Sequence, residues 1–404
     1  MAYKNLRDWI RTLEKEGELA RIKAEVNWDL EIGGIAQENF DRRGPALLFE
    51  NIKDYRDTIC TQFFTASLSK YSRIAMMMGL PGDTDTRKLI EIYRDRVKNP
   101  VKPVKVETGA VKENIIGPDG VDLLQFPAPK WHHLDGGRYI GTFDGVVTKD
   151  PETGWVNVGL YRRMIHDRNH TGITIIHGQH IWQHWRKHKK LGLKTMPVAM
   201  VNGWDPVLPM STSASFPPGV CEYDMMGALR QEPVPLVKCE TIDLEVPADA
   251  EIVVEGEISL DFDNFRFEGP FGEYHGYYAS IGSSKPVITW KCMTHRDDPI
   301  LQGTLEGVPV NESDLVTSVS WSAIYLEFLQ QQMTGITGVY VDPSSNVFVQ
   351  VDNSYIGQPQ QVAFALWGLG GSATLGKNIM VVDQDIDIFD LDRLAWAFAT
   401  RVLP

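Results

Sequence analysis

The sequence predicts a mixed α/β (α+β) protein with more than one domain. Its 404 residues are enough for two or three domains with cores of their own. Helix-like and strand-like patterns alternate near both ends of the chain, whereas short strand-like segments dominate the middle. The 43% of hydrophobic residues is typical of a soluble globular protein, and no stretch approaches the roughly 18 uninterrupted apolar residues of a membrane span.

The first segment is predicted to be an α/β domain over residues 1–106. Leu6, Ile10, Leu13 and Leu19 lie near helical spacing, and Gly17 stands where a helix would end. The pattern also predicts helices over 29–41, 67–78 and 85–97 and a strand over 46–52. Residues 99–106 alternate proline and lysine with valine, which predicts an extended linker and the first domain boundary.

The middle segment, residues 107–305, is predicted to be β-rich. Strand patterns occur at 155–161, 171–176, 197–202, 235–240, 251–260 and 287–293. Short strands at this density, with a few helices between them, favour a barrel or a sandwich.

The last segment, residues 306–404, returns to an α/β pattern. Helices are expected over 314–333, 358–369 and 390–401, with strands over 339–341, 347–351 and 378–382. Residues 368–373 fit a GxGxxA dinucleotide motif, but they follow a predicted helix rather than a strand, so we do not expect a dinucleotide site there.

Charge and cysteine use narrow the function classes. A net charge of −13 argues against a nucleic-acid binder, which usually presents a basic face. The four cysteines are far apart and form no CxxC pair, and the N-terminus has no signal-peptide pattern. We therefore expect reduced thiols and a cytoplasmic protein.

The segment Glu268-Gly-Pro-Phe-Gly-Glu273-Tyr-His275-Gly276 is the strongest candidate for chemistry. On a regular strand the two glutamates would point to opposite faces, but the Gly-Pro-Phe-Gly turn between them can bring both to one site. Two adjacent carboxylates tend to separate their pKa values, so one can act as acid and the other as base. Taken alone, the segment is equally compatible with a surface turn that carries two solvated glutamates.

Asn157 lies in a strand-like stretch over 155–161, and Arg162 follows directly after it. The two have opposite parity, so they serve different parts of one site or a bulge separates them. The guanidinium of Arg162 could bind a substrate carboxylate through two hydrogen bonds, although a salt bridge at the rim is the commoner role of an arginine.

All ten histidines lie between positions 132 and 295, which concentrates ligand chemistry in the middle segment. His180, His184 and His188 would share one face of a helix, but Ile181 stands where a zinc protease carries glutamate. We expect His184 and His188 to belong to a solvated basic face and His180 to be the better ligand.

A loop rich in serine, proline and glycine, residues 211–222, ends in an acid. Such a loop can offer carbonyls, hydroxyls and amides to a cation or a phosphate, although an ordinary surface loop is the alternative. Asn157, His180 and Glu222 together would form a mixed nitrogen and oxygen set that suits Mn²⁺ or Mg²⁺.

In combination these motifs resemble the UbiD family of prenylated-FMN-dependent (de)carboxylases. The resemblance extends over the whole chain, and the order and spacing of its motifs are specific. It is carried by the opening Leu-Arg-Asp-Trp, Asp135-Gly-Gly-Arg-Tyr139, Asn157 to Arg162, Gly178-Gln-His180, Gly219-Val-Cys-Glu222, Glu268–Gly276, Val382-Asp-Gln-Asp-Ile-Asp387 and Trp396 to Arg401.

The resemblance implies the fold and the catalytic residues. It implies a central split β-barrel that binds flavin and a C-terminal domain for oligomerisation. By its pattern, Arg162 would clamp the substrate carboxylate, Glu268 would orient Arg162, and Glu273 would deliver the proton that replaces CO₂.

The resemblance also implies the cofactors and their ligands. Asn157, His180 and Glu222 would hold the divalent ion, Mn²⁺ or Mg²⁺, on the cofactor phosphate, and backbone carbonyls would hold K⁺. The K⁺ set matches Val158, Ser211, Thr212 and Ala214, and further contacts to prenylated FMN match Gly159, Leu160, Tyr161, Arg162, Gln179, Ser213, Ala214 and Ser215.

The implied substrate is an aromatic or conjugated carboxylic acid, with CO₂ as the other partner. A flavin prenyltransferase would supply the cofactor, and the chain would form a homodimer or a higher oligomer. The aromatic ring could lie against Trp131, His132, His133, Tyr139 or Tyr161, although core packing is the other expectation for these side chains. Family members extend beyond the final helix, so we expect a shortened C-terminal domain or a different closure of the pocket.

Two other functions remain open at this point. A metal-dependent hydrolase could use His180, His184 and Glu222 without a flavin. A non-catalytic subunit of a multi-subunit carboxylase would have no chemical need for Arg162, Glu268 and Glu273, so their presence argues against it.

Overall fold

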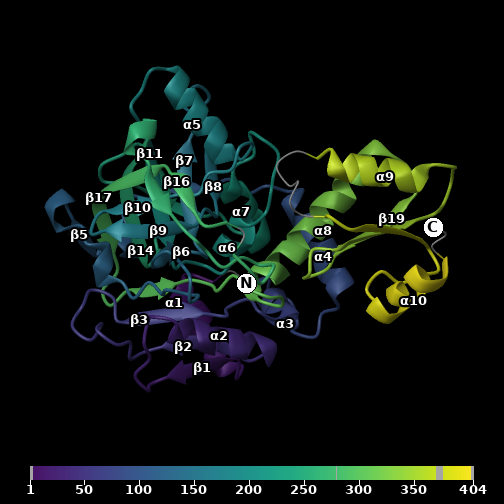
Figure 1. Ribbon diagram of the computed structural model, residues 1–404, viewed down its shortest axis with the longest axis horizontal. Coiled ribbons are helices and arrows are strands. Elements are labelled where there is room, and N and C mark those ends of the chain that lie inside the picture. Colours follow the sequence, from purple (N-terminus) through teal and green to yellow (C-terminus); the bar gives the residue numbers. More distant parts are fainter. Residues whose placement is uncertain (1–2, 279, 370–375, 402–404) are drawn as a thin grey trace.

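The structure is a computed structural model that describes residues 3–278, 280–369 and 376–401. A helix-containing N-terminal part, a central curled half-barrel sheet and a C-terminal α/β part follow one another along the chain (Figure 1). The predicted mixed α/β class is therefore confirmed.

The N-terminal part begins with helix α1 (Leu6–Lys15), which buries one apolar face that includes Trp9. The side chain of Asn5 accepts the amide hydrogen of Asp8 and caps the helix. The small sheet has the order β1 (Leu19–Ile22), β2 (Ala46–Phe49), β3 (Gln62–Thr65) and β18 (Ile300–Gln302). The other helices are α2 (Glu31–Asp41), α3 (Tyr71–Met77) and α4 (Thr86–Val97), close to the predicted ranges.

The predicted linker over 99–106 is in part a strand. Val104–Lys105 form β4, which pairs in parallel with β12 (Pro235–Lys238), and β12 pairs with β13 (Glu245–Pro247). The prolines of this segment have no amide hydrogen, but the amides of Val104 and Val106 donate to the carbonyls of Val234 and Leu236. The segment is therefore fixed to the central part of the chain.

The central sheet is antiparallel and has a non-sequential strand order. The order is β6 (Tyr139–Gly141), β9 (Arg163–Asp167), β10 (His170–Gly172), β17 (Val287–His295), β14 (Ile252–Ser259), β11 (Thr195–Asn202), β7 (Gly145–Lys149) and β8 (Val156–Gly159), with β5 (Asn114–Ile116) on β17. Strand β8 ends at Gly159, so residues 160–162 form a connection to β9 rather than the end of one long strand. This break explains how Asn157 and Arg162 can serve one site despite their opposite parity.

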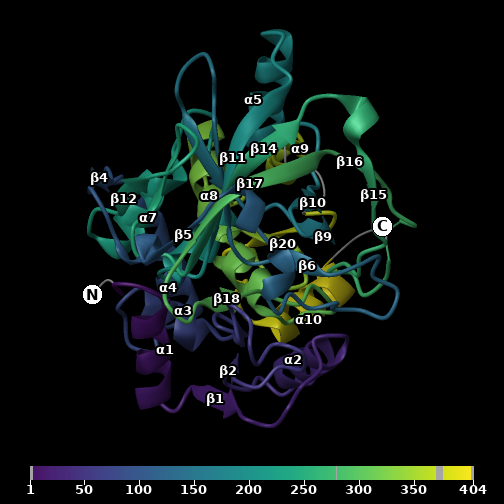
Figure 2. The same ribbon diagram turned by 90° about the vertical axis from the view of Figure 1, so that its left-hand side faces the viewer.

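Shorter elements surround the curled sheet. The ribbon of β15 (Arg266–Glu268) and β16 (Ser283–Lys285) lies beside β10 (Figure 2). The helices of this part are α5 (His180–Lys190), α6 (Val207–Thr212) and α7 (Glu222–Arg230). Single 3₁₀ turns lie at Ala110–Lys112, Pro118–Gly120, Leu123–Gln125 and Phe262–Asn264.

The C-terminal part follows the predicted order of helices and strands. Its elements are α8 (Glu312–Gln332), β19 (Ile336–Val341), β20 (Val347–Val351), α9 (Gln358–Trp367), β21 (Ile379–Asp383) and α10 (Leu391–Arg401). A reciprocal cap between Asn311 and Asp314 starts α8. Of the motif at 368–373, residues 370–373 lie outside the described residues.

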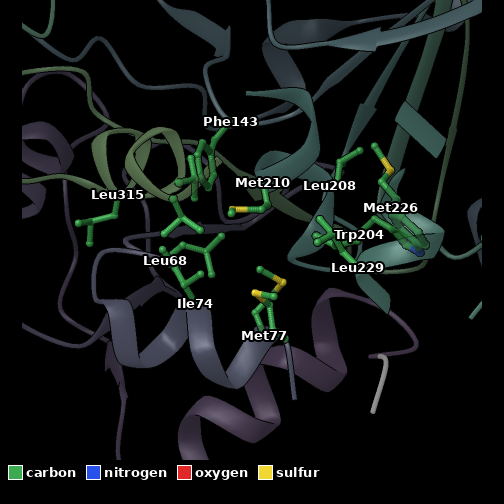
Figure 3. Packing of buried hydrophobic residues seen from close by; sticks show 14 of the residues in the cluster. Leu68, Ile74, Met77, Phe143, Trp204, Leu208, Met210, Met226, Leu229 and Leu315 are labelled. Atoms are coloured by element: carbon green, nitrogen blue, oxygen red, sulfur yellow. The ribbon is translucent and has the colours of Figure 1, made fainter. Parts of the chain in front are cut away.

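One hydrophobic cluster connects the N-terminal helices to the central part and to α8. In Figure 3, Ile74 and Met77 on α3 face Met210 on α6, with Met226 of α7 and Leu315 of α8 on either side. These side chains are nearly completely buried. The N-terminal, central and C-terminal parts therefore share a continuous core.

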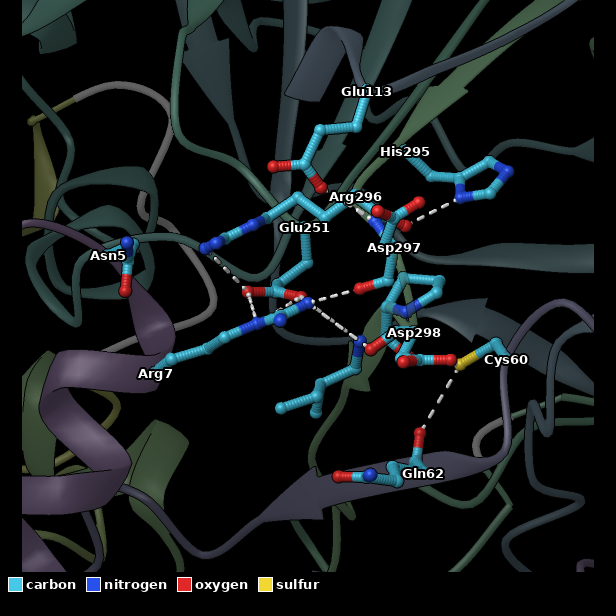
Figure 4. A network of polar contacts seen from close by, with 12 residues as sticks. Asn5, Arg7, Cys60, Gln62, Glu113, Glu251, His295, Arg296, Asp297 and Asp298 are labelled. Atoms are coloured by element: carbon cyan, nitrogen blue, oxygen red, sulfur yellow. Dashed lines mark hydrogen bonds and ion pairs between the residues drawn. The ribbon is translucent and has the colours of Figure 1, made fainter. Parts of the chain in front are cut away.

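A buried ion-pair network fastens α1 to the end of the central sheet (Figure 4). The fully buried carboxylate of Glu251 contacts Arg7 at 2.8 Å and Arg296 at 3.4 Å, and it also accepts the amide hydrogen of Ile300. A buried charge that loses one partner destabilises a fold strongly.

Glu251→Gln is therefore expected to destabilise the protein by about 3 kcal/mol. The effect appears as a lower apparent Tm in thermal unfolding followed by circular dichroism. Glu257→Gln is the matched control, because Glu257 lies on β14 in a partly exposed pair with Lys291 and should matter by less than about 0.5 kcal/mol. Equal Tm values for the two variants would contradict this assignment.

Among the described residues, no helix combines the length and apolar character needed to cross a membrane. Cys60, Cys221, Cys239 and Cys292 are all free thiols.

Candidate functional site

Arg162 lies between the two glutamates that the sequence singled out. Its Nε is 3.3 Å from Oε1 of Glu268, and its Nη1 contacts Oε1 of Glu273. The Glu268 side chain is fully buried, whereas the side chains of Arg162 and Glu273 are 23% and 25% exposed. The interpretation of this segment as a turn with two solvated glutamates is therefore wrong. We call these three residues the trio.

Opposing influences act on the ionisation of the trio. Burial raises the pKa of Glu268, whereas Arg162 and the hydroxyl of Thr174 favour its ionised form. Burial disfavours the charged guanidinium of Arg162, but Glu273 and Glu268 outweigh it, so the pKa of Arg162 lies above its usual value. The guanidinium also lies over the ring of Phe271, 4.6 Å from the ring centre.

Residues 269–273 form the turn that carries Glu273, which we call the acid turn. This turn is fixed to the segment before β6. Asp135 accepts the amide hydrogens of Gly272 at 2.9 Å and of His132 at 2.9 Å. Pro270 accepts the amide hydrogen of Gly136 at 2.8 Å. Gly269 has φ +101°, a conformation that favours glycine, and its carbonyl would overlap a Cβ on Gly136. The Asp135-Gly-Gly motif therefore positions the acid turn, a role that the sequence did not reveal.

Asp135→Ala is expected to loosen this turn, because it removes two hydrogen bonds to a buried carboxylate. Hydrogen–deuterium exchange of backbone amides over 270–278 should become at least ~10-fold faster. Asp261→Ala, which removes a similar bond from an exposed turn, serves as a control and should leave residues 270–278 unchanged. Unchanged exchange in Asp135→Ala would show that the turn does not depend on this carboxylate.

A cavity of about 990 Å³ lies next to the trio. Its wall includes the predicted cofactor contacts Asn157, Gly159, Leu160, Tyr161, Gln179, His180, Ser213, Ala214, Ser215 and Glu222, and α4 and α8 complete it. The trio lies outside this wall, and Arg162 joins it through the adjoining Tyr161. A volume of this size is at the upper end of that of ligand pockets.

The three predicted divalent-ion ligands lie close together. Oε2 of Glu222 accepts the amide hydrogen of Val158, the residue after Asn157, at 2.7 Å, and Oε1 lies 3.9 Å from Nδ1 of His180. Asn157 and Glu222 are buried, and burial raises the pKa of Glu222. The three come from different elements, because Asn157 lies within β8 whereas His180 and Glu222 begin α5 and α7.

The residues predicted to offer carbonyls to a monovalent ion lie near the three predicted divalent-ion ligands. Ser211 and Thr212 end helix α6 and Glu222 begins α7, so only residues 213–221 form the expected loop. The carbonyl of Thr212 accepts the amide hydrogen of Leu160 at 3.1 Å, and that of Ser211 accepts the amide hydrogen of Ala214 at 3.2 Å. Val158 lies in the β7–β8 ladder. The hydroxyls of Ser211 and Ser213 are buried and have no hydrogen-bond partner among the described residues.

The prediction that His184 and His188 lie on a solvated basic face is wrong. Both are buried, with exposed fractions of 0% and 6%, because this face of α5 packs against the central sheet while its lysines point outward. Nδ1 of His184 lies 3.0 Å from the hydroxyl of Thr148, and burial lowers the pKa of His184 to about 4. The indole of Trp155 contacts the rings of both His180 and His184.

A hydrolytic metal centre of His180, His184 and Glu222 is therefore not assembled. Within the described part of the chain, no three histidine, cysteine, aspartate or glutamate side chains are arranged to hold a metal. The predicted Mn²⁺ or Mg²⁺ ligands are not such a group, because only His180 and Glu222 are of these residue types and the third ligand is the side-chain amide of Asn157.

Glu306 is a further acid near the trio that sequence reasoning missed. Burial raises the pKa of Glu306 to about 7, and the nearby charge of Glu273 acts in the same direction. Its side chain hydrogen-bonds to Ser313, which lines the cavity, and its carbonyl oxygen is 2.5 Å from Nε2 of His132. The one signal for Glu306 in the sequence is that it follows the apolar Leu305 and precedes Gly307.

Of the five aromatic residues proposed to line the pocket, Tyr161 lies in the cavity wall and the other four do not. Trp131 and Tyr139 are core residues, with exposed fractions of 2% and 1%. Tyr161 lines the cavity, whereas Nε2 of His132 contacts the carbonyl oxygen of Glu306. His133 is not part of the cavity wall.

An arginine between two acids, beside a large cavity, is an arrangement that could bind a carboxylate. The chain matches three family models over most of its length. Residues 102–309 match the 3-octaprenyl-4-hydroxybenzoate carboxy-lyase Rift-related domain, residues 10–93 the corresponding N-terminal domain, and residues 317–404 the C-terminal domain. The chain belongs to the UbiD family of carboxy-lyases.

Named relatives agree with this assignment. The chain is 33% identical to the pyrrole-2-carboxylic acid decarboxylase of Pseudomonas aeruginosa over 99% of its own length and 83% of the relative's. It superimposes with a TM-score of 0.93 and 30% identity on the closed form of the vanillic acid decarboxylase of Sedimentibacter hydroxybenzoicus, over 100% of this chain and 86% of that one. With an evolved dimeric form of the UbiD-class enzyme HmfF from Pelotomaculum thermopropionicum, in complex with prFMN, the TM-score is 0.88 at 30% identity, over 99% and 90% of the two chains.

Proposed function

We propose that the protein catalyses the reversible, non-oxidative decarboxylation of an aromatic or α,β-unsaturated carboxylic acid with prenylated FMN. The observation that carries this proposal is the contact of one guanidinium, Arg162, with both Glu268 and Glu273. The relatives support the substrate class, because they are named for pyrrole-2-carboxylic, phenolic, ferulic and vanillic acids.

The residues around the cavity fit such a cofactor. Its wall offers the amide of Asn157, the imidazole of His180 and the carboxylate of Glu222, a set that suits Mn²⁺ or Mg²⁺ bound to a phosphate. The hydroxyls of Ser211 and Ser213, which have no hydrogen-bond partner among the described residues, are further oxygen ligands near this set. The carbonyls of Val158, Ser211, Thr212 and Ala214 are the proposed K⁺ ligands. The remaining cofactor contacts are Gly159, Leu160, Tyr161, Gln179 and Ser215.

The chain's own residues bind, orient and protonate. Arg162, whose side chain is partly exposed, binds the substrate carboxylate through its guanidinium, while the buried Glu268 fixes the orientation of that group. Glu273, which is partly exposed, donates the proton that takes the place of CO₂ on carbon. When bound, prenylated FMN supplies the electron sink for the carbanion-like charge of the substrate.

A flavin prenyltransferase is the proposed source of the cofactor, and a homodimer or larger homo-oligomer in the cytoplasm is the proposed assembly. Co-expression with such an enzyme should give a protein with flavin-like absorbance that releases CO₂ from one or more of the relatives' acids. Asn157→Ala, His180→Ala and Glu222→Ala should each reduce the bound flavin per chain. A coloured, folded protein that releases CO₂ from none of these acids would contradict the proposal.

A further inference from the structure

A narrow notch beside Gly172 brings together two buried polar atoms that have no assigned role. Gly172 ends β10, His166 lies on the neighbouring β9, and Glu268 ends β15 (Figure 2). A Cβ on Gly172 would overlap with Oε2 of Glu268 and would lie 3.1 Å from Nε2 of His166. Both atoms therefore border the same small space, which exists because residue 172 has no side chain.

Neither atom has a hydrogen-bond partner among the described residues. Oε1 of Glu268 is occupied, since it receives Thr174 at 3.0 Å and Arg162 at 3.3 Å, whereas Oε2 of this fully buried side chain receives nothing. A buried carboxylate oxygen without a donor is costly, and buried polar groups in folded proteins are almost always paired. The nearest candidate donor that borders the notch is the imidazole of His166.

The surroundings of His166 favour the neutral ring, which can donate to Glu268 when Nε2 carries the proton. Burial and Arg266 on β15 lower the pKa of His166, and His170 adds to this effect, while Asp167 opposes it. Asp167 is itself engaged by Arg266 at 2.7 Å and by His170 at 2.7 Å. Lys285 and the buried Arg163 are further charged groups that interact with Glu268. A neutral imidazole carries one N–H, and the buried Nε2 is the nitrogen that faces Glu268.

We propose that His166 is a positioning residue for the trio. Its Nε2–H donates to Oε2 of Glu268 across the notch at Gly172, either directly or through one water molecule. This hydrogen bond fixes the position of the Glu268 carboxylate, which orients Arg162, and it favours the ionised form of Glu268. The catalytic consequence rests on the function proposed above, whereas the hydrogen bond itself can be tested without turnover.

The first test uses cofactor-free protein and an NMR titration of the His166 ring, identified by its loss in His166→Gln. A negative Glu268 favours the imidazolium, so Glu268→Gln should lower the titration midpoint of His166 by roughly 0.5 pH unit or more. Glu273→Gln, which removes the other carboxylate of the trio, should change it much less. A midpoint that Glu268→Gln leaves in place overturns the proposal, whether or not the enzyme proves to be a decarboxylase.

The second test uses the cofactor-loaded enzyme. His166→Leu should lower kcat by roughly 10-fold and move the acid limb of the pH profile to higher pH, because Glu268 then loses a donor to its ionised form. His166→Gln, which keeps an N–H donor, should stay within about threefold of the wild type with an unmoved limb. In the Glu268→Gln background, His166→Leu should have almost no further effect. An equal loss in both backgrounds would mean that His166 acts independently of Glu268.

Gly172→Ala provides a third variant that leaves both partners in place. The added methyl group fills the notch and displaces Oε2 of Glu268, so it should reproduce the kcat loss of His166→Leu. Gly34→Ala is the matched control, because a Cβ at that position meets no atom within 4 Å. Wild-type kcat and pH profile in Gly172→Ala would contradict the proposed contact.

Discussion

Arg162→Leu is expected to lower kcat/KM for decarboxylation by ~10³-fold or more. The substitution removes the proposed donor to the substrate carboxylate and leaves Glu268 buried without its cationic partner. Arg162→Lys should recover little activity, because an ammonium group cannot contact Glu268, Glu273 and a substrate carboxylate with a planar fork. Steady-state kinetics with the cofactor-loaded enzyme measures both effects.

Folding must be separated from chemistry in the Arg162 variants. Arg162→Lys keeps a positive charge beside Glu268, so its Tm should stay closer to the wild-type value than that of Arg162→Leu. Arg168→Lys is the matched control, since Arg168 is exposed and pairs with Asp122 at 3.1 Å away from the trio. Wild-type activity in Arg162→Lys would show that the fork geometry is not required.

Glu273→Gln is expected to lower kcat by about 10³-fold while changing KM by less than about threefold. Glutamine keeps the size of the side chain and can still contact Arg162, but it has no proton to donate to carbon. Glu268 still orients Arg162, so binding of the substrate carboxylate should persist.

Glu273→Asp provides the matched comparison, since it keeps a transferable proton at a shorter reach. It should be more active than Glu273→Gln and less active than the wild type. Single-turnover kinetics should show the loss in the chemical step rather than in binding. Glu273→Gln turning over as fast as the wild type would remove Glu273 from its proposed role.

Patterns with a strong local cause were predictable from the sequence. Helices α1, α2, α4 and α10 were predicted because each has an apolar face or terminal residues typical of a helix. Strands such as β7 (Gly145–Lys149) and β9 (Arg163–Asp167) were missed because five residues carry little pattern, although each pairs with the strand that follows it as well as with a distant one. The division at residues 106 and 305 stays a prediction, and β18, which precedes the second boundary, pairs with β3 of the N-terminal sheet.

The acid turn illustrates what a local pattern can and cannot predict about a site. The glycines and proline around Glu268 and Glu273 indicated a bend, and both acids do reach one arginine. That Arg162 is this partner came from the family resemblance, because more than 100 residues separate it from the turn.

The supporting residues could not be predicted from the sequence. Asp135, His166 and Glu306 meet the trio only through tertiary packing. His184 was misassigned because its neighbours in the sequence are basic, although the helix turns its ring into the core.

Solvent-deuterium incorporation tests the central claim most directly. Protein co-expressed with a flavin prenyltransferase is incubated in D₂O with pyrrole-2-carboxylate, vanillate and ferulate, and the products are analysed by mass spectrometry and NMR. The proposed chemistry predicts that at least one acid loses CO₂ and gains one deuterium at the carbon that carried the carboxylate, and that Glu273→Gln slows both by about 10³-fold. Flavin-loaded, folded wild-type protein that yields neither CO₂ nor deuterated product from any of these acids would contradict it.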